Sequence, residues 1–160
     1  MLLTGTFPRA IDEKLRIAIP KRLRDGLQLA DQAELYITPG TDGSLALYTE
    51  ETLTSLASRL AHASPTAADV RAFGRMFYAA AERVEIDAQG RIRIPPALAQ
   101  AASLGKEAVL LGVHDHLELW DPVRWEAYLA QRAGNYDEIA ERAFGTVAGP
   151  SAAATPANLQ

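Results

Sequence analysis

An aspartate and an arginine placed four residues apart occur twice in this chain of 160 residues, each time followed by Ile-x-Ile-Pro. The first copy holds Asp12 and Arg16; the second, 75 residues further on, holds Asp87 and Arg91. An aspartate at the end of a strand accepts hydrogen bonds from backbone N–H groups two or three residues later, which fixes a turn. The guanidinium that begins the returning strand either pairs with this carboxylate or reaches a phosphate or a guanine edge. The residues alone leave both roles open for each motif.

More lysines and arginines surround the two motifs. The whole chain has a formal net charge of −4, yet residues 9–24 hold six basic residues against two acidic ones. A local basic surface can bind phosphate even on an acidic protein. We predict DNA contacts from the side chains of Lys14, Arg16, Lys21, Arg22, Arg24, Arg91 and Arg93. The three at positions 21 to 24 have helical spacing and face solvent, where they either anchor phosphates or form a solvated helix face.

The elements around each motif are repeated as well, which indicates one module written twice. After each motif a proline ends a strand and suits the first turn of a helix. In the first copy we expect a short helix, two strands and a longer helix at 20–27, 34–38, 45–48 and from Glu50. In the second copy the same order is expected at 96–102, 108–113, 117–120 and from Pro122. Further strands are expected at 3–11, 16–19, 83–86 and 91–94, and further helices at 67–82 and 136–144.

Composition narrows the possible classes of protein. Apolar content of 48% and charged content of 22% are typical of a globular domain. Each repeat alone could bury only a thin core, so we expect the two halves to share one. The chain has no cysteine, which excludes disulfides and thiolate metal sites and is consistent with the cytoplasm. It has no apolar run of about 18 residues and no basic-then-apolar N-terminus, so we expect neither a membrane span nor a signal peptide.

With its paired Asp-x-x-x-Arg-Ile-x-Ile-Pro motifs, the chain resembles the bacterial MraZ family over about residues 1–144. Gly5 near the start, the strand at 117–120 and Trp125 in the following helix add to the resemblance. The resemblance implies an α+β fold: a swapped-hairpin, AbrB-like β-barrel built from two pseudo-symmetric repeats, with peripheral helices. It divides the chain into a first repeat with its linking helices at 1–82, a second repeat at 83–144 and a disordered tail at 145–160.

The resemblance also implies a function. Members of this family assemble into homo-oligomeric rings that bind short direct repeats upstream of the division and cell-wall gene cluster. They regulate its transcription, commonly as repressors, and are cytoplasmic and nucleoid-associated. On this basis we expect promoter DNA and further copies of the chain as partners, and no enzyme activity, cofactor, metal or small-molecule substrate.

One position departs from the family pattern. The family usually has a glycine just before the arginine of the first motif, as Gly90 precedes Arg91 in the second motif here, but the first motif of this chain has Leu15. Glycine readily supplies the left-handed residue that closes such a hairpin. Because leucine disfavours that conformation, we expect the first turn to be built differently from the second.

Two other classes of function are compatible with parts of the sequence. In an enzyme, Asp12 and Asp87 would form a carboxylate pair, or His114 and His116 would bind a metal, but no third ligand stands at a familiar spacing. In an antitoxin-like protein-binding module, without operator binding, an exposed apolar segment would hold the partner. The helices around Phe73, Phe77 and Trp125 are the candidates for this segment, and core packing or a subunit interface is their other use.

Overall fold

A computed structural model describes residues 1–30 and 32–147 and shows a mixed α+β fold. The strands are β1 (Thr6–Ala10), β2 (Arg16–Ala18), β3 (Glu34–Pro39), β4 (Leu45–Tyr48), β5 (Glu82–Glu85), β6 (Arg91–Arg93), β7 (Glu107–Val113) and β8 (His116–Trp120). The helices are α1 (Lys21–Gly26), α2 (Glu50–Ala61), α3 (Ala68–Ala80), α4 (Pro96–Ala101), α5 (Pro122–Arg132) and α6 (Tyr136–Val147), with a 3₁₀ turn, η1 (Ala133–Asn135).

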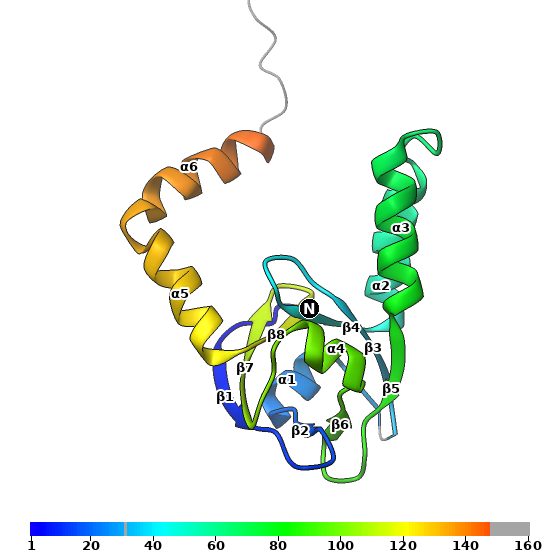
Figure 1. Cartoon of the computed structure of the whole chain (residues 1–160), viewed down its shortest axis with the longest axis vertical. Coiled ribbons are helices and arrows are strands. Elements are labelled where there is room, and N and C mark those ends of the chain that lie inside the picture. The colour runs from blue at the N-terminus through cyan, green and yellow to red at the C-terminus, as the bar shows by residue number, and fades with distance from the viewer. Residues whose placement is uncertain (31, 148–160) are drawn as a thin grey trace, which may run out of the picture. The chain divides into compact units, whose positions relative to one another are not determined.

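The strands form two sheets, and both are symmetric in the two repeats. The larger sheet has the order β1-β7-β8-β4-β3-β5, which reads the same from either end when each strand is exchanged for its counterpart in the other repeat (Figure 1). The smaller sheet is the antiparallel pair β2-β6. The larger sheet ends at β1 and β5 among the described residues, and these two edge strands are not paired with each other.

Two cross-strand pairs mark a pseudo-twofold axis. In the smaller sheet Ile17 lies opposite Ile92, its own counterpart in the second repeat. In the larger sheet Ala46 of β4 likewise lies opposite its counterpart, Glu118 of β8. Each repeat thus contributes one strand to each central pairing, and both sheets contain strands of both repeats.

Both repeats supply the hydrophobic core, as expected from their size. Ile17 and Ile92 are each 1% exposed and lie in one cluster with the apolar side chains of α1, α4 and the central strands. Strand β7 is buried over most of its length, as its nearly continuous apolar run predicts. Its buried centre pairs with β1 on one side and β8 on the other.

Helix boundaries follow local signals in the sequence. Helix α2 begins after Thr49, whose Oγ1 accepts a hydrogen bond from the backbone N–H of Thr52 at 3.2 Å. The short helices α1 and α4 both begin directly after the motif proline. Two residues after each helix ends comes a residue in the left-handed conformation, Gln28 or its counterpart Ser103. The first strand is shorter than predicted, because Gly5 has a φ of +101° and interrupts it, which leaves Leu3 in an isolated bridge to His114.

Residues up to Trp125 form one compact unit, and the described residues from Glu126 to Val147 belong to a second. The second unit contains α6, which extends through Val147. The tail expected at 145–160 therefore begins inside this helix, and from residue 148 it lies outside the described residues. Among the described residues no helix is both long and apolar enough to cross a membrane.

Candidate nucleic-acid interface

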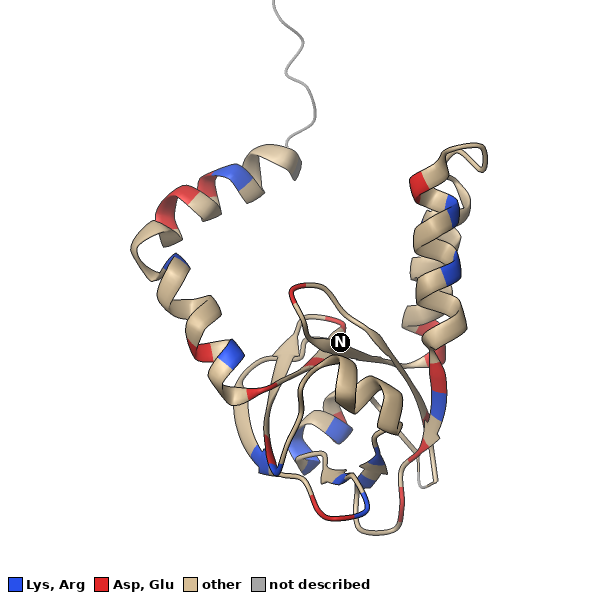
Figure 2. Ribbon diagram, in the orientation of Figure 1, with Lys and Arg blue, Asp and Glu red and all other residues tan. Residues whose placement is uncertain are grey.

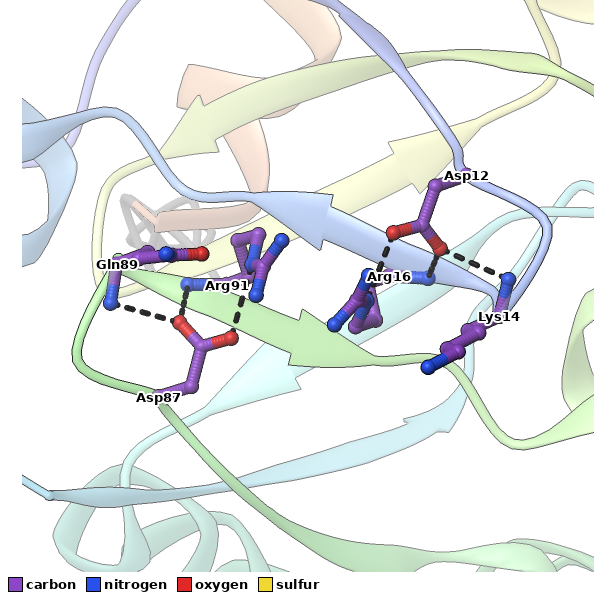
Figure 3. A network of polar contacts seen from close by, with 6 residues as sticks. All are labelled: Asp12, Lys14, Arg16, Asp87, Gln89 and Arg91. Carbon is purple, nitrogen blue, oxygen red and sulfur yellow. Dashed lines mark hydrogen bonds and ion pairs between the residues drawn. The ribbon is translucent and has the colours of Figure 1, made fainter.

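The first motif forms a turn held by one carboxylate. Asp12 Oδ1 accepts hydrogen bonds from the backbone N–H groups of Lys14 at 2.9 Å and Arg16 at 2.8 Å. Asp12 Oδ2 accepts a hydrogen bond from Arg16 Nε at 2.7 Å (Figure 3). The aspartate thus fixes the turn and the arginine side chain together.

The second motif repeats this geometry. Asp87 Oδ1 accepts from the backbone N–H groups of Gln89 and Arg91, both at 2.9 Å, and its Oδ2 accepts from Arg91 Nε at 2.9 Å (Figure 3). The arginine of each motif can pair with its aspartate and still reach a phosphate or a guanine edge, because each ion pair uses only Nε. Among the described residues, the Nη groups of Arg16 and Arg91 donate to no protein acceptor.

Backbone N–H donors keep both aspartates ionised. The pKa of Asp12 and that of Asp87 are lowered from the ordinary value, chiefly by the hydrogen bond from the backbone N–H of Arg16 or Arg91. Partial desolvation opposes this effect on each pKa, and the arginine side chain adds to it. Each carboxylate therefore remains negative at neutral pH and orients its own guanidinium.

The expectation that Leu15 would change the first turn was wrong. Leu15 has a φ of +60° and takes the same left-handed conformation as Gly90, whose φ is +78°. Its carbonyl oxygen accepts from Ile94 N at 2.8 Å, as that of Gly90 accepts from Ile19 N at 2.9 Å. Leu15 packs against the hydrophobic core, which helps to offset the cost of this conformation.

Strands β2 and β6 place the motif arginines on one face of a two-stranded ribbon. Arg16 lies opposite Arg93, and Ala18 lies opposite Arg91. The central pair, Ile17 and Ile92, points into the core, so the alternating neighbours point outward. The side chains of Arg16 and Arg91 are about one-third exposed (33% and 29%), and Arg93 is exposed. We call this outer face, with Arg16, Arg91 and Arg93, the ribbon face.

Helix α1 adds basic residues at the same end of the first unit (Figure 2). Lys21 is exposed and pairs with Asp25 at 2.7 Å, while Arg22 is exposed and lies 3.4 Å from Thr4 Oγ1. Arg24 was expected to face solvent, but it is partly buried, and its Nε donates to the carbonyl oxygen of Ile19 at 3.0 Å. Of the three predicted anchors on α1, only Lys21 and Arg22 are exposed.

A groove of about 490 Å³ lies beside the ribbon, lined by Arg16, Arg91 and Arg93 together with Gln32 and Glu85. The sequence did not single out Gln32 or Glu85, because neither belongs to a motif and their position depends on how β5 and the loop before β3 approach the ribbon. The groove is open and contains both charge signs.

The enzyme alternative gains no support from the geometry. Each motif aspartate is directed at the arginine of its own repeat, so the two do not form a carboxylate pair (Figure 3). His116 Nδ1 lies 2.8 Å from Asp115 Oδ1, and His114 is exposed in a left-handed turn. In the part of the chain that the structure describes, no three His, Cys, Asp or Glu side chains are grouped to hold a metal.

Comparisons with known proteins agree with the repeat. A family model described as "MraZ protein, putative antitoxin-like" matches twice, at residues 2–76 and 77–147. A protein of Ligilactobacillus salivarius named "Transcriptional regulator MraZ" is 41% identical over 140 residues, covering 88% of this chain and 95% of its own. A protein of Thermomicrobium roseum with the same name is 40% identical over 141 residues, covering 88% and 96%. A solution structure from Pyrococcus horikoshii is 14% identical, covers 76% of this chain and 98% of its own, and has a TM-score of 0.34, too low to bear on the fold.

Proposed function

The chain belongs to the MraZ family, and we propose that it is a sequence-specific DNA-binding transcriptional regulator that contacts DNA through the ribbon face. The observation that carries the proposal is the set of three guanidiniums, Arg16, Arg91 and Arg93, on the exposed side of one antiparallel ribbon. The major groove of B-DNA admits a two-stranded ribbon, and arginine donates two hydrogen bonds to guanine there. A negatively charged partner fits these side chains.

Each residue of the proposed interface has a distinct role. Asp12 and Asp87 hold the turns and hold Arg16 and Arg91 through Nε, which leaves the Nη groups for guanine or phosphate. Gly90 closes the second turn. Lys14 extends from the first turn, and the basic side chains of α1 anchor phosphates: Lys21, Arg22 and Arg24.

The finer architecture belongs to the same proposal. We propose that the two sheets are parts of a swapped-hairpin, AbrB-like β-barrel formed by repeats at 1–82 and 83–144, and that copies assemble into a ring. The family resemblance and the interlocked pairing of β2 with β6 support this architecture. A ring presents many ribbon faces at once, so weak contacts add through effective concentration.

The regulatory role proposed here follows the family. The protein binds direct repeats upstream of the division and cell-wall gene cluster and represses its transcription. It acts in the cytoplasm, in association with the nucleoid. Direct repeats match a head-to-tail assembly, whereas a palindrome matches a twofold dimer. A footprint on the upstream region, combined with a reporter fusion in cells with and without the gene, tests the site and the direction of regulation.

The variant Arg16→Ala tests the ribbon face. We expect it to lose operator binding in an electrophoretic mobility shift at moderate salt, since Arg16 supplies the free Nη groups of the first turn. Its melting temperature should change little, because exposed ion pairs contribute little to stability. Wild-type binding should also weaken steeply with salt as counterions are released.

The matched control is Arg75→Ala, which removes an exposed arginine from α3, outside the ribbon. We expect it to bind like the wild type. If Arg16→Ala binds as well as the wild type, or if both variants lose binding equally, the ribbon face is not the DNA-binding surface.

A protein-binding module is the second candidate function. Helix α3 exposes Phe73 (47%), Met76 (73%) and Tyr78 (44%), which is unusual for solvated side chains of this size. Native mass spectrometry combined with the mobility shift separates the two candidates. A monomer that fails to shift its own upstream DNA would favour the module, and a ring that shifts it would favour the regulator.

A further inference from the structure

The backbone of the first unit is pseudo-twofold symmetric, but its charges are not. The first turn carries Glu13, Lys14 and Leu15, whereas the second carries Ala88, Gln89 and Gly90 at the counterpart positions. Both turns have the same hydrogen bonds, so they present different side chains from one backbone shape. The difference therefore affects what the turns contact rather than how they fold.

The ribbon between the turns is also uneven. Arg16 and Arg93 lie opposite each other at the end next to the first turn, while Arg91 faces Ala18 at the other end. Backbone hydrogen bonds join Ile94 to Leu15 and Ile19 to Gly90. Because bonded and non-bonded pairs alternate in an antiparallel ladder, Arg16–Arg93 falls at a non-bonded position, where side chains are closest.

Two like charges directly opposite each other destabilise a sheet. Among the described residues no carboxylate is bonded to Arg93, and Arg16 is bonded to Asp12 through Nε alone. The paired guanidiniums at this end are thus suited to an anion placed between them. The opposite end, with Ala18 beside Arg91, has no such pair.

The helices beside the turns differ in charge as well, and here the basic residues lie next to the second turn. Lys21 and Arg24 of α1 line a hollow of about 520 Å³ together with Asp87 and Ala88 of the second turn. The counterparts of Lys21 and Arg24 in α4 are the uncharged Pro96 and Ala99. The first turn thus carries Lys14 beside the acidic Glu13, whereas the second turn has no charge at these positions. Helix α1, which lies beside the second turn, carries Lys21, Arg22 and Arg24 against Asp25.

We infer that this unequal charge fixes the direction in which the chain lies on its DNA site, an inference that rests on the proposed function. A fully symmetric module would bind a duplex equally well in two opposite orientations. Here reversal would move Lys14 and the Arg16–Arg93 pair away from their bases and phosphates and move α1 to the wrong flank. Each misplaced arginine or lysine contact costs about tenfold in affinity, so one orientation prevails.

The absence of native cysteine makes orientation directly measurable. Single cysteines replace Glu13 in the first turn or Ala88 in the second, and each carries an iron chelate that cleaves nearby DNA. Both full-length proteins are bound to a duplex with one repeat unit from the region upstream of the gene. We expect each label to cut one flank, the two labels to cut opposite flanks, and both patterns to invert when the repeat is inverted.

An exchange variant tests the cause. It swaps side chains at two pairs of counterpart positions through Lys14→Gln with Gln89→Lys, and Ala18→Arg with Arg93→Ala, which leaves composition and net charge unchanged. We expect the preference for one flank to fall at least about tenfold. In this variant the lysine and the arginine pair lie at the opposite end of the ribbon, so the difference between the two ends is reversed. A thermal melt confirms that each labelled variant is folded before cleavage.

The outcomes separate the two proposals. If the wild-type chain binds no upstream DNA, the proposed function fails and the inference fails with it. If it binds but each label cuts both flanks equally, only the inference is overturned. If the exchange variant keeps the full wild-type preference, the ribbon ends do not set the direction and the inference is likewise overturned.

Discussion

Gly90 and Leu15 occupy equivalent positions and take the same left-handed conformation, but a side chain at position 90 would meet a neighbour from the other repeat. A Cβ added to Gly90 would lie 2.7 Å from Cζ of Arg24. The residue that corresponds to Arg24 in the other repeat is Ala99, a small buried side chain. The large Arg24 of the first repeat thus faces the small Gly90 of the second repeat. At the counterpart positions the sizes are reversed, with Ala99 on the helix of the second repeat and Leu15 in the turn of the first.

Gly90→Ala should therefore destabilise the protein. A left-handed conformation costs a non-glycine residue about 1–2 kcal/mol, and displacement of Arg24 from Ile19 adds to this. The double variant Gly90→Ala with Arg24→Ala removes the clash and should recover part of the loss. Chemical denaturation measures these free energies of unfolding.

The neighbouring substitution Gln89→Ala is the control for this prediction. Gln89 is exposed and its side chain makes no hydrogen bond with any described residue, so we expect a change within about 0.5 kcal/mol. An equal loss of stability in Gln89→Ala and Gly90→Ala would show that neither the backbone conformation nor Arg24 matters at this turn.

The two motif aspartates predict a dependence of stability on pH. The folded-state pKa of Asp12 lies below the ordinary value of 3.8, because backbone N–H groups stabilise its ionised form. Its contribution to stability is thus fully present above pH 3.8 and is lost as pH falls through the lower folded-state pKa. Asp87 has the same sign for the same reason.

We expect Asp12→Asn to melt below the wild type at neutral pH, and the difference to shrink at acidic pH as the wild-type carboxylate becomes protonated. Melting temperatures measured across this range test the prediction. A difference that stays constant with pH would mean that ionisation of Asp12 does not stabilise the turn.

Turn chemistry at this scale was predictable only in part. The hydrogen bonds of Asp12 and Asp87 depend on residues within four positions, so the sequence predicted them. The conformation of Leu15 was predicted wrongly, because it depends on core contacts across the pseudo-twofold axis. The partial burial of Arg24 was missed for a related reason: its neighbour Gly90 comes from the other repeat.

Among the elements, helices α1 and α4 have the same sequence signals for folding but differ in the charge of their exposed residues. Both follow a proline, both bury a leucine at the same position, Leu23 or Leu98, and both end in a left-handed residue. Their outer residues differ, because a solvated face has little influence on whether the helix forms. Divergence between repeats is therefore tolerated on the surface, where it changes the charge beside each turn.

The strands and helices themselves were largely predictable, since alternation, proline stops and the Thr49 cap are local signals. The pairing of strands was not. Strand β2 pairs with β6 of the other repeat rather than with a neighbour in sequence, and no periodicity specifies a partner so far along the chain. This long-range pairing is what brings Arg16 and Arg93 together on the ribbon face.

For the whole molecule, the shared core makes the two repeats depend on each other for stability. Ile17 and Ile92 come from different repeats, lie opposite each other and are each 1% exposed. Removing either side chain leaves a cavity that both repeats line. The two halves of the first unit should therefore unfold together rather than one after the other.

Ile17→Ala and Ile92→Ala should each lower the free energy of unfolding by about 2–5 kcal/mol, the usual range for a buried isoleucine. The loss of unfolding free energy in the double variant should differ from the sum of the two single losses, since residues in contact are coupled. Hydrogen exchange should accelerate in β3 and in β7 alike for either single variant. Val123→Ala, at a position 73% exposed, is the control and should leave both stability and exchange unchanged. If Ile17→Ala accelerates exchange in its own repeat alone, the halves fold independently, and a DNA-binding ribbon made from both would lack the rigid base that the proposed function requires.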